Sequence, residues 1–309
     1  MNNNDWPIGH MIQMTMSRFV LTVVCPARRG IVAAISTFLA KNTCNIVNSS
    51  QFDDALSKKF FCRVGFDSEG GKDMHELEKE FEPIAREFSM NANFFDTQDR
   101  MKVVIMVSKF GHCLNDLIYR WRIGALPIDI TGVISNHLDY QKLVVNNDLP
   151  FYHIPVNKDR KQQAEDRLFE IISGTGTELV VLARYMQILS DRLCKEMSGK
   201  IINIHHSFLP SFKGANPYKQ AFQRGVKIIG ATAHYVTADL DEGPIIEQDV
   251  VRVTHAQNAD DYVALGRDVE AQVLARAIHA HIHHRVFIND NRTVVFPATP
   301  GSYASERMG

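Results

Sequence analysis

The sequence predicts an α/β protein of two domains, a small mixed domain followed by a larger one built on a mostly parallel sheet. The 309 residues exceed the usual size of one hydrophobic core. Short apolar strand patterns alternate with amphipathic helix patterns along most of the chain. A polar run, DTQDR at 96–100, interrupts this alternation and is typical of a linker. We therefore expect one domain over 14–96 and a second over 101–309.

The first domain has the element order β-α-β-β-α-β. The expected strands are Ser17–Val24, Ile46–Phe52, Lys59–Phe66 and Asn93–Asp96, and the expected helices are Ile31–Lys41 and Asp73–Phe88. This order is that of the ferredoxin-like split pattern, in which an antiparallel sheet carries two helices.

The second domain alternates apolar strands with helices, which predicts a largely parallel, Rossmann-like sheet with helices on both faces. A long helix, Asp260–His284, and a small hairpin, Val286–Phe296, close the chain. The expected strands are Lys102–Val107, Ile128–Ser135, Phe151–Ile154, Glu178–Leu182, Ile201–Ile204 and Ile228–His234.

Composition excludes several classes of protein. With 34 Lys and Arg against 35 Asp and Glu, the net charge of -1 provides no general basic field for nucleic acid. No apolar stretch approaches the ~20 residues of a membrane span, and the first residues, MNNNDWPIGHM, do not resemble a secretory signal. The five scattered cysteines suit a reducing compartment. We expect a cytoplasmic protein without a nucleic-acid or membrane partner.

Polar side chains that can perform chemistry gather where two predicted strands end. Asn203 and His205 are two residues apart on one strand, so their side chains point to the same face. His234 ends a later strand, and Asp239 and Asp241 follow it in a loop. Because open α/β sheets bind ligands beyond their strand ends, we expect these groups to share a cleft.

Two motifs, NIHHSFLPSF at 203–212 and HYVTADLDEGPII at 234–246, resemble in order and separation the signature of folate-dependent formyltransferases and hydrolases. The first domain resembles an ACT module. The resemblance implies that Asn203, His205 and Asp241 carry catalysis on a formyl-folate. It also implies folate-binding positions in the loop ARYMQIL and beside the catalytic residues: Tyr185, Met186, Gln187, Ile188, Leu189, His206, His234 and Asp239.

Hydrolysis of 10-formyltetrahydrofolate explains why these residue types belong together. Water attacks the formyl carbon, negative charge develops on the formyl oxygen, and N10 requires a proton. The Asn203 amide can donate to the oxyanion. His205 can be a second oxyanion donor or the general acid, and Asp241 can orient His205 or take a proton from water; one sequence leaves both divisions open. His234 is expected to hold the Asp241 loop.

Two departures from simpler transferases favour water as the acceptor. These relatives usually have Pro where this chain has His206. They also carry a Gly- and Ser-rich phosphate loop where this chain has SKFGHCLND at 108–116. The resemblance thus implies release of formate, which would serve purine biosynthesis and balance one-carbon pools. The alternatives are formyl transfer to an amine on a nucleotide or an aminoacyl-tRNA, and an inactive amino-acid sensor.

The ACT resemblance implies a regulatory or oligomer-forming domain. Gly30, Ile31, Asn45 and Asn48 would bind an amino-acid effector, glycine or methionine, although Ala27 replaces an Asp that related modules often carry. We expect a homo-oligomer, a dimer or a tetramer.

No metal site and no cofactor beyond the folate substrate are expected. His279 and His283 have the i, i+4 spacing of metal ligands, but no nearby carboxylate completes a site. Histidines at a helix C-terminus are instead favoured by the helix dipole.

Overall fold

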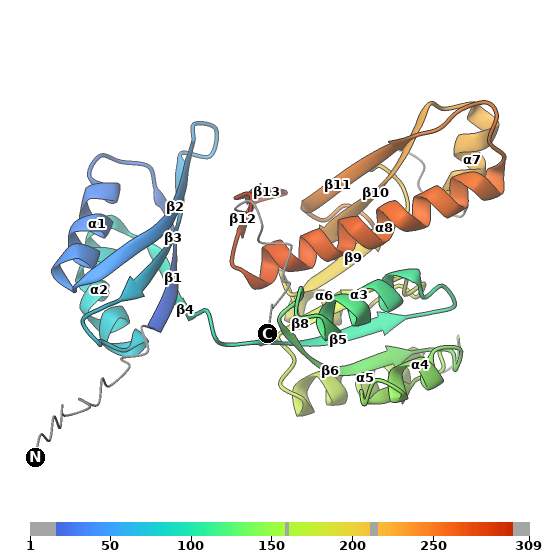
Figure 1. Ribbon diagram of the computed structural model, residues 1–309, viewed down its shortest axis with the longest axis horizontal. Coiled ribbons are helices and arrows are strands. Elements are labelled where there is room, and N and C mark those ends of the chain that lie inside the picture. The colour runs from blue at the N-terminus through green and yellow to red at the C-terminus, as the bar shows by residue number, and fades with distance from the viewer. Residues whose placement is uncertain (1–16, 158–160, 211–215, 299–309) are drawn as a thin grey trace, which may run out of the picture. The chain divides into compact units, whose positions relative to one another are not determined.

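The computed structural model describes residues 17–157, 161–210 and 216–298 (Figure 1). The chain consists of two compact units, Met1–Asp99 and Arg100–Gly309. The expected domain limits at residues 14 and 309, and the polar start of the chain, lie outside the described residues.

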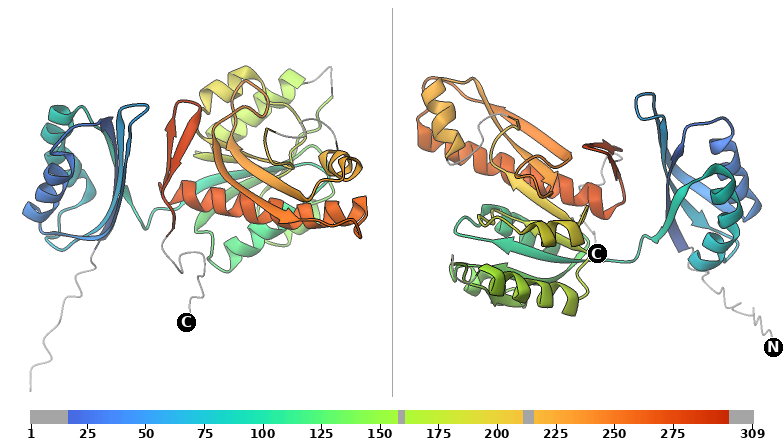
Figure 2. Two further views of the ribbon diagram at one scale, coloured as in Figure 1. Left: turned by 90° about the horizontal axis from the view of Figure 1, so that it is seen from above. Right: turned by 180° about the vertical axis from the view of Figure 1, so that it is seen from behind.

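The N-terminal unit is a ferredoxin-like domain, as predicted. Its four strands form an antiparallel sheet in the order β2-β3-β1-β4. Both helices lie on the same face of this sheet, as Figure 2 shows, and the arrangement is consistent with an ACT domain. The elements are β1 (Ser17–Pro26), α1 (Ile31–Lys41), β2 (Cys44–Asp54), β3 (Lys59–Ser68), α2 (Met74–Phe88) and β4 (Asn91–Asp96).

Aromatic packing between sheet and helices forms the core of this unit. The Phe81 ring of α2 lies 5.7 Å from the Phe94 ring of β4, and Phe94 lies 6.3 Å from Phe66 of β3. Each such buried ring contributes roughly 1.5–3 kcal/mol. The capping box of Asp73 and Glu76 fixes the start of α2, so Asp73 is the N-cap and not the first helical residue.

The C-terminal unit is a three-layer α/β domain. Its sheet has the order β11-β10-β9-β8-β5-β6-β7, and β8, β9, β5, β6 and β7 pair in parallel, as predicted. The elements are β5 (Met101–Val107), α3 (His112–Arg122), β6 (Ile128–Ser135), α4 (Gln141–Val145), β7 (Phe151–His153), α5 (Lys161–Gly174), β8 (Leu179–Leu182), α6 (Asp191–Glu196), β9 (Ile201–His205), α7 (Pro217–Arg224), β10 (Ile228–Tyr235), β11 (Ile245–Arg252), α8 (Ala259–Ile282), β12 (Val286–Asn289) and β13 (Arg292–Val295).

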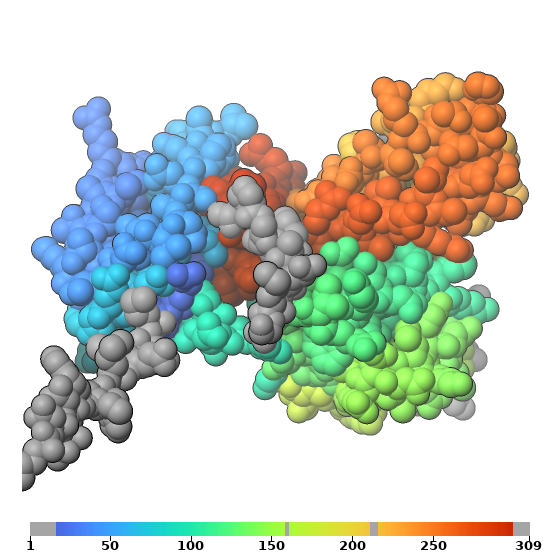
Figure 3. All heavy atoms as spheres, in the orientation of Figure 1, coloured from blue at the N-terminus to red at the C-terminus, as the bar shows by residue number. Residues whose placement is uncertain are grey.

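Helices cover both faces of the central strands. On β5, Val103 and Ile105 face a core shared with α3 and α8, whereas Val104 and Met106 face a second core shared with α5 and α6. Figure 3 shows α8, in orange, packed directly against α3, in green. Continuous apolar runs on central strands follow from burial on both faces.

The strand β11 was not predicted, and β10 runs antiparallel to both β9 and β11. Residues 245–252 contain Glu247, Gln248 and Asp249, and this polar run obscures the strand pattern at the sheet's edge. The rest of the unit agrees with the predicted mostly parallel sheet.

Two further properties concern membrane-spanning helices and the state of the cysteines. Among the described residues, no helix combines the length and apolar character needed to cross a bilayer. All five cysteines are free thiols in buried positions.

Candidate active site

A cleft of ≈ 280 Å³ lies where β8, β9 and β10 lead into their loops. Every residue that the sequence marks as catalytic or folate-binding lines it. These residues are Tyr185, Met186, Gln187, Ile188, Leu189, Asn203, His205, His206, His234, Asp239 and Asp241. The expectation of a shared cleft is therefore met, while the role of each residue stays a prediction.

Strand pairing brings the polar groups together. Asn203 and His205 lie two apart on β9, and the antiparallel register places His234 of β10 directly opposite Asn203. The direction of β10, antiparallel to β9, was not predicted. Because β10 runs the other way, its end lies beside Ile202, and the loop after β10 must turn back toward β9.

Close backbone approach holds this loop. Tyr235 donates its N–H to the carbonyl of Pro244 at 2.9 Å. A Cβ on Gly243 would lie 1.7 Å from the Tyr235 carbonyl oxygen, so only glycine fits at this position. Asp241 has a φ of 56°, in the left-handed region that non-glycine residues seldom adopt.

The Asp241 carboxylate lies between two histidines. Oδ2 is 3.3 Å from Nδ1 of His205, and Oδ1 is 3.6 Å from Nε2 of His234. Burial by itself would raise the pKa of Asp241, but the interactions with His205 and His234 outweigh it and hold this pKa well below its ordinary value. Asp241 is therefore an anion at neutral pH.

His234 is fixed by its neighbours. Its Nδ1 lies 2.8 Å from the Tyr235 carbonyl oxygen, so Nδ1 carries a hydrogen and donates. Its Nε2 lies 3.2 Å from Nδ2 of Asn203. When His234 is neutral, this Nε2 accepts from Asn203; when His234 is charged, Nε2 donates to Asp241 and so stabilises the carboxylate. In both states Nδ2 of Asn203 keeps at least one hydrogen for a ligand. The role expected for His234, holding the Asp241 loop, stays a prediction.

His205 lines the cleft and has one ring nitrogen without a partner among the described residues. Because Nδ1 faces the Asp241 anion, the tautomer with hydrogen on Nδ1 is favoured. Nε2 is buried and has no hydrogen-bond partner within the described part of the chain. Such a group is costly unless a ligand or water satisfies it. Nε2 can accept a proton from a ligand when His205 is neutral and donate one when it is charged.

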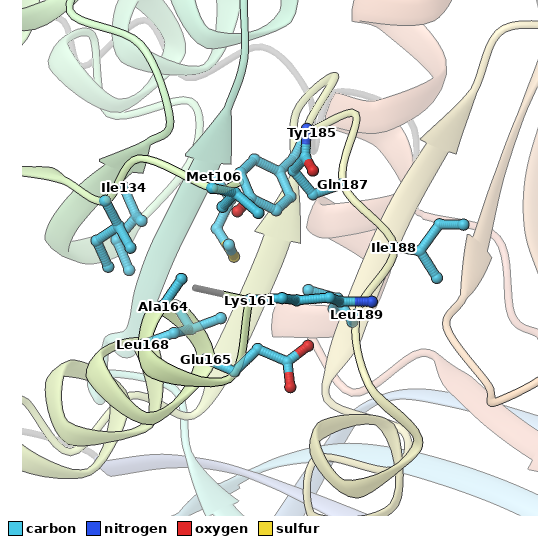
Figure 4. Close-up of a pocket in the computed structure, with 12 residues that line it drawn as sticks. Met106, Ile134, Lys161, Ala164, Glu165, Leu168, Tyr185, Gln187, Ile188 and Leu189 are labelled. Carbon is cyan, nitrogen blue, oxygen red and sulfur yellow. The ribbon is translucent and has the colours of Figure 1, made fainter. Parts of the chain in front are cut away.

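The loop that follows β8 forms the opposite wall. Met186 donates its N–H to Oγ of Ser108 at 3.0 Å, which anchors the loop to the end of β5. Behind it lies an apolar cavity of ≈ 20 Å³ between Tyr185, Leu189, Met106 and α5, drawn in Figure 4. Such a space admits about one water, so a folate ring system requires the larger cleft.

A second buried carboxylate, which the sequence did not reveal, lies beside the cleft. Glu270 of α8 is 1% exposed. It accepts from Tyr218 at 2.6 Å, contacts Nε2 of His112 at 2.8 Å and pairs with Nε of Arg184 at 3.3 Å. Burial alone would raise the pKa of Glu270, but His112, Arg184 and Tyr218 outweigh burial and lower it. We call these four residues the Glu270 cluster.

Little in the sequence signals this cluster. Glu270 stands in the run DVEAQVL, where a single charge in a helix usually faces solvent, and its partners come from three other segments. Among the described residues, His112, Cys113 and Glu270 also form the one group of metal-ligand type. The Arg184 cation already pairs with that carboxylate, and burial raises the pKa of the Cys113 thiol well above its ordinary value. These features disfavour a cation there.

The start of α3 is occupied by the protein's own groups. Gly111 donates its N–H to the Tyr140 hydroxyl at 2.7 Å, and His112 is engaged with Glu270. A Cβ on Gly111 would lie 2.2 Å from the Tyr140 ring. The N-terminal amide of a helix is a common phosphate ligand, and here the Gly111 amide is already bonded to Tyr140.

The effector candidates of the N-terminal unit lie at two places. Gly30 caps α1 with a φ of 94° and precedes the buried Ile31. Asn45 is exposed on β2, and Oδ1 of Asn48 already accepts from Arg63 at 2.7 Å. The groove between α1 and α2 is lined by none of the four; it is formed by Ala33, Ala34, Thr37, Phe38, Lys41, Asn42, Glu80 and Ile84.

Comparison with known proteins gives three consistent findings. Residues 101–278 match the formyl transferase family. A formyltetrahydrofolate deformylase of Corynebacterium sp. (strain P-1) is 52% identical over 90% of this chain and 98% of its own. The crystal structure of a formyltetrahydrofolate deformylase from Pseudomonas syringae pv. tomato is 48% identical, with a TM-score of 0.89 over 93% of this chain and 96% of its own.

A transferase shares the fold of the C-terminal unit. Glycinamide ribonucleotide transformylase 1 from Symbiobacterium toebii is 27% identical, with a TM-score of 0.61 over 66% of this chain and 98% of its own. The covered 66% of this chain is close to the share that Arg100–Gly309 represents.

The Glu270 cluster generates a stability prediction. Glu270→Gln keeps the shape of the side chain but leaves the buried Arg184 cation without its counter-charge. We expect the free energy of unfolding, measured by urea titration, to fall by about 3–5 kcal/mol. As a control, Glu170→Gln, which breaks the exposed pair with Arg167, should change it by about 0.5 kcal/mol or less. A loss for Glu270→Gln no larger than the control's would contradict the assignment.

Proposed function

The chain belongs to the formyltetrahydrofolate deformylase family, and on this premise we propose that it hydrolyses 10-formyltetrahydrofolate to formate and tetrahydrofolate. The observation that carries the proposal is the cleft in which the Asp241 anion aligns His205 and His234, while Nε2 of His205 stays unsatisfied among the described residues. Nothing in this arrangement requires an acceptor other than water.

In the proposed reaction the formyl oxygen binds between Asn203 and His205. The free Nδ2 hydrogen of Asn203 and a protonated Nε2 of His205 are the two donors that the cleft offers side by side on β9. Donors already placed where an oxyanion develops stabilise it without reorganisation, and one such donor is typically worth about 10²-fold or more in rate.

Protons and atoms balance in two steps. Water adds to the formyl carbon and gives a tetrahedral intermediate. The C–N10 bond then breaks, N10 receives one proton, and formic acid leaves and loses the other. His205 is placed to pass a proton to N10 through Nε2, and Asp241, held 3.3 Å from Nδ1, stabilises the charged imidazole.

The folate is proposed to lie along the loop Ala183–Leu189. Main-chain groups of this loop would pair with the flat pterin, and Tyr185, Met186, Gln187, Ile188 and Leu189 would form the wall around it. His206 and Asp239 line the same cleft. Asp239 is exposed and its carbonyl accepts from Thr237 at 3.1 Å, so it belongs to the rim.

Formyl transfer to an amine is less well supported. The amide of Gly111 and the ring of His112, the groups nearest a helix-start phosphate site, are bonded to Tyr140 and Glu270. A nucleotide acceptor would have to displace both contacts.

We also propose a cytoplasmic location, a homo-oligomer and no cofactor beyond the folate substrate. Five free buried thiols suit a reducing compartment. The edge strand β2 exposes Ile46, Val47 and Phe52, which supports pairing of N-terminal sheets between chains. Formate from this reaction would supply purine biosynthesis. Glycine or methionine is the proposed effector at Gly30, Ile31, Asn45 and Asn48.

The first test of the proposed function is release of formate without an acceptor. Purified protein incubated with 10-formyltetrahydrofolate alone should yield formate and tetrahydrofolate in equal amounts. EDTA should leave the rate unchanged, because the proposed chemistry uses only side chains and water. A strict requirement for an added amine would reject hydrolysis, and loss of activity in EDTA with recovery in Zn²⁺ would reject the metal-free scheme.

The catalytic assignments predict a loss confined to turnover. Asp241→Asn and His205→Ala should each lower kcat by about two orders of magnitude or more, because each removes an acid-base or charge-stabilising group. Folate binding, measured by titration with tetrahydrofolate, should change little. Asp129→Asn, an exposed carboxylate on β6, serves as the control. Turnover at the wild-type rate in either cleft variant would refute its role.

Removal of the N-terminal unit should separate assembly from chemistry. A fragment beginning at Arg100 should fold and keep part of the activity, because the C-terminal unit has its own cores. Light scattering should show a smaller particle than the full chain forms, and any response of the full chain to glycine or methionine should disappear. A fragment that keeps both the oligomer and the response would show that these properties belong to the other unit.

A further inference from the structure

His206 occupies a boundary between two cavities. It follows β9 directly and lines both the cleft of ≈ 280 Å³ and a second cavity of ≈ 160 Å³ near α7. The backbone just beyond it is held firmly: Oγ1 of Thr232 donates to the Ser207 carbonyl at 2.9 Å and accepts from the Leu209 N–H at 3.0 Å. The position of His206 is therefore set by the fold.

The ring of His206 touches other rings but forms no polar contact. Its centroid lies 5.2 Å from that of His205 and 6.2 Å from that of Tyr218. Within the described ranges, neither ring nitrogen has a hydrogen-bond partner. A half-buried imidazole at the wall of a cleft with both nitrogens open is placed to hold a small polar molecule.

Burial keeps this ring neutral, and a nearby cation adds to its effect. Burial, followed by the nearby Arg184 cation, lowers the pKa of His206 to about 3, although Glu270 and Asp241 act in the opposite direction. A neutral imidazole has one nitrogen that donates and one that accepts. Its accepting nitrogen can therefore hold a water by one O–H and leave an oxygen lone pair free.

We propose that His206 holds the attacking water in the hydrolysis of the formyl group. The inference rests on the proposed function and adds a positioning residue to it. With the formyl oxygen at Nε2 of His205, a water hydrogen-bonded to the neighbouring ring 5.2 Å away lies within reach of the formyl carbon.

His206 positions the water and does not keep its proton. A ring that burial and Arg184 hold in the neutral form is a weak base, so the proton released on attack must pass to N10 or to solvent. The Glu270 cluster enters at this point, because Glu270 fixes the Arg184 cation beside His206. The neutral His206 ring thereby offers the attacking water a nitrogen that accepts a hydrogen bond. An amine that took up the formyl group would need binding contacts other than this one.

The test separates positioning of water from general damage. His206→Ala should lower kcat for formate release about 10²-fold, with KM for the folate changed by about twofold or less. His206→Gln should recover about tenfold of that loss, because its amide oxygen again accepts a hydrogen bond. The ratio of formohydroxamate to formate in the presence of hydroxylamine should rise about tenfold in His206→Ala, since hydroxylamine supplies its own nucleophile.

Three outcomes would overturn the inference. The first is a wild-type kcat in His206→Ala. The second is an equal loss of formate and formohydroxamate in that variant. The third is a kcat in His206→Gln no higher than in His206→Ala, with the thermal unfolding midpoint unchanged. His255→Ala, an exposed histidine outside both cavities, is the matched control and should behave as wild type. Failure of the wild type to release formate without an amine would instead refute the proposed hydrolysis, so the two claims fail separately.

Discussion

The cleft depends on the Asp241 carboxylate, which stands between the imidazoles of His205 and His234. A carboxylate in this position needs both partners, because burial without them would raise its pKa and favour the neutral form. The antiparallel register of β9 and β10 places one partner, because it sets His234 opposite Asn203. Gly243 brings the carboxylate to its partners, since its close approach to the Tyr235 carbonyl turns the loop back over the strands. The backbone geometry of this loop therefore determines where the negative charge lies.

A second buried carboxylate, Glu270, is also held by partners that offset the cost of burying its charge. Glu270 gathers Arg184, His112 and Tyr218 from three segments far apart in the sequence. Leaving a buried charge of this cluster unpaired would cost several kcal/mol. Arg184 also lies at the start of the loop that lines the cleft, with a φ of 67°. The cluster therefore fixes the loop that lines the cleft and also pairs the buried Arg184 cation with a counter-charge.

The sequence was informative where local pattern decides structure. The helix Ile31–Lys41 and the strand Ile128–Ser135 were predicted at their observed limits, and the residues assigned to catalysis and folate binding lie in one cleft. Local pattern could not reveal β11, whose polar residues suit an edge, or the direction of β10, which depends on pairing with β9. It also could not reveal Glu270, because burial of a single charge depends on partners that only the tertiary fold brings near.

Hydrolases and transferases that share this fold face opposite problems at the same carbon. A transferase must recognise its acceptor and exclude water, whereas a hydrolase must only hold water and leave no site for an amine. In this chain the groups that could bind an acceptor are consumed internally: the Gly111 amide by Tyr140, and His112 by Glu270. Each of these contacts also stabilises the fold, so an acceptor would have to compete with native structure to bind. Specificity for water would then need no group dedicated to rejecting a nucleotide acceptor, because native contacts already engage the Gly111 amide and the His112 ring.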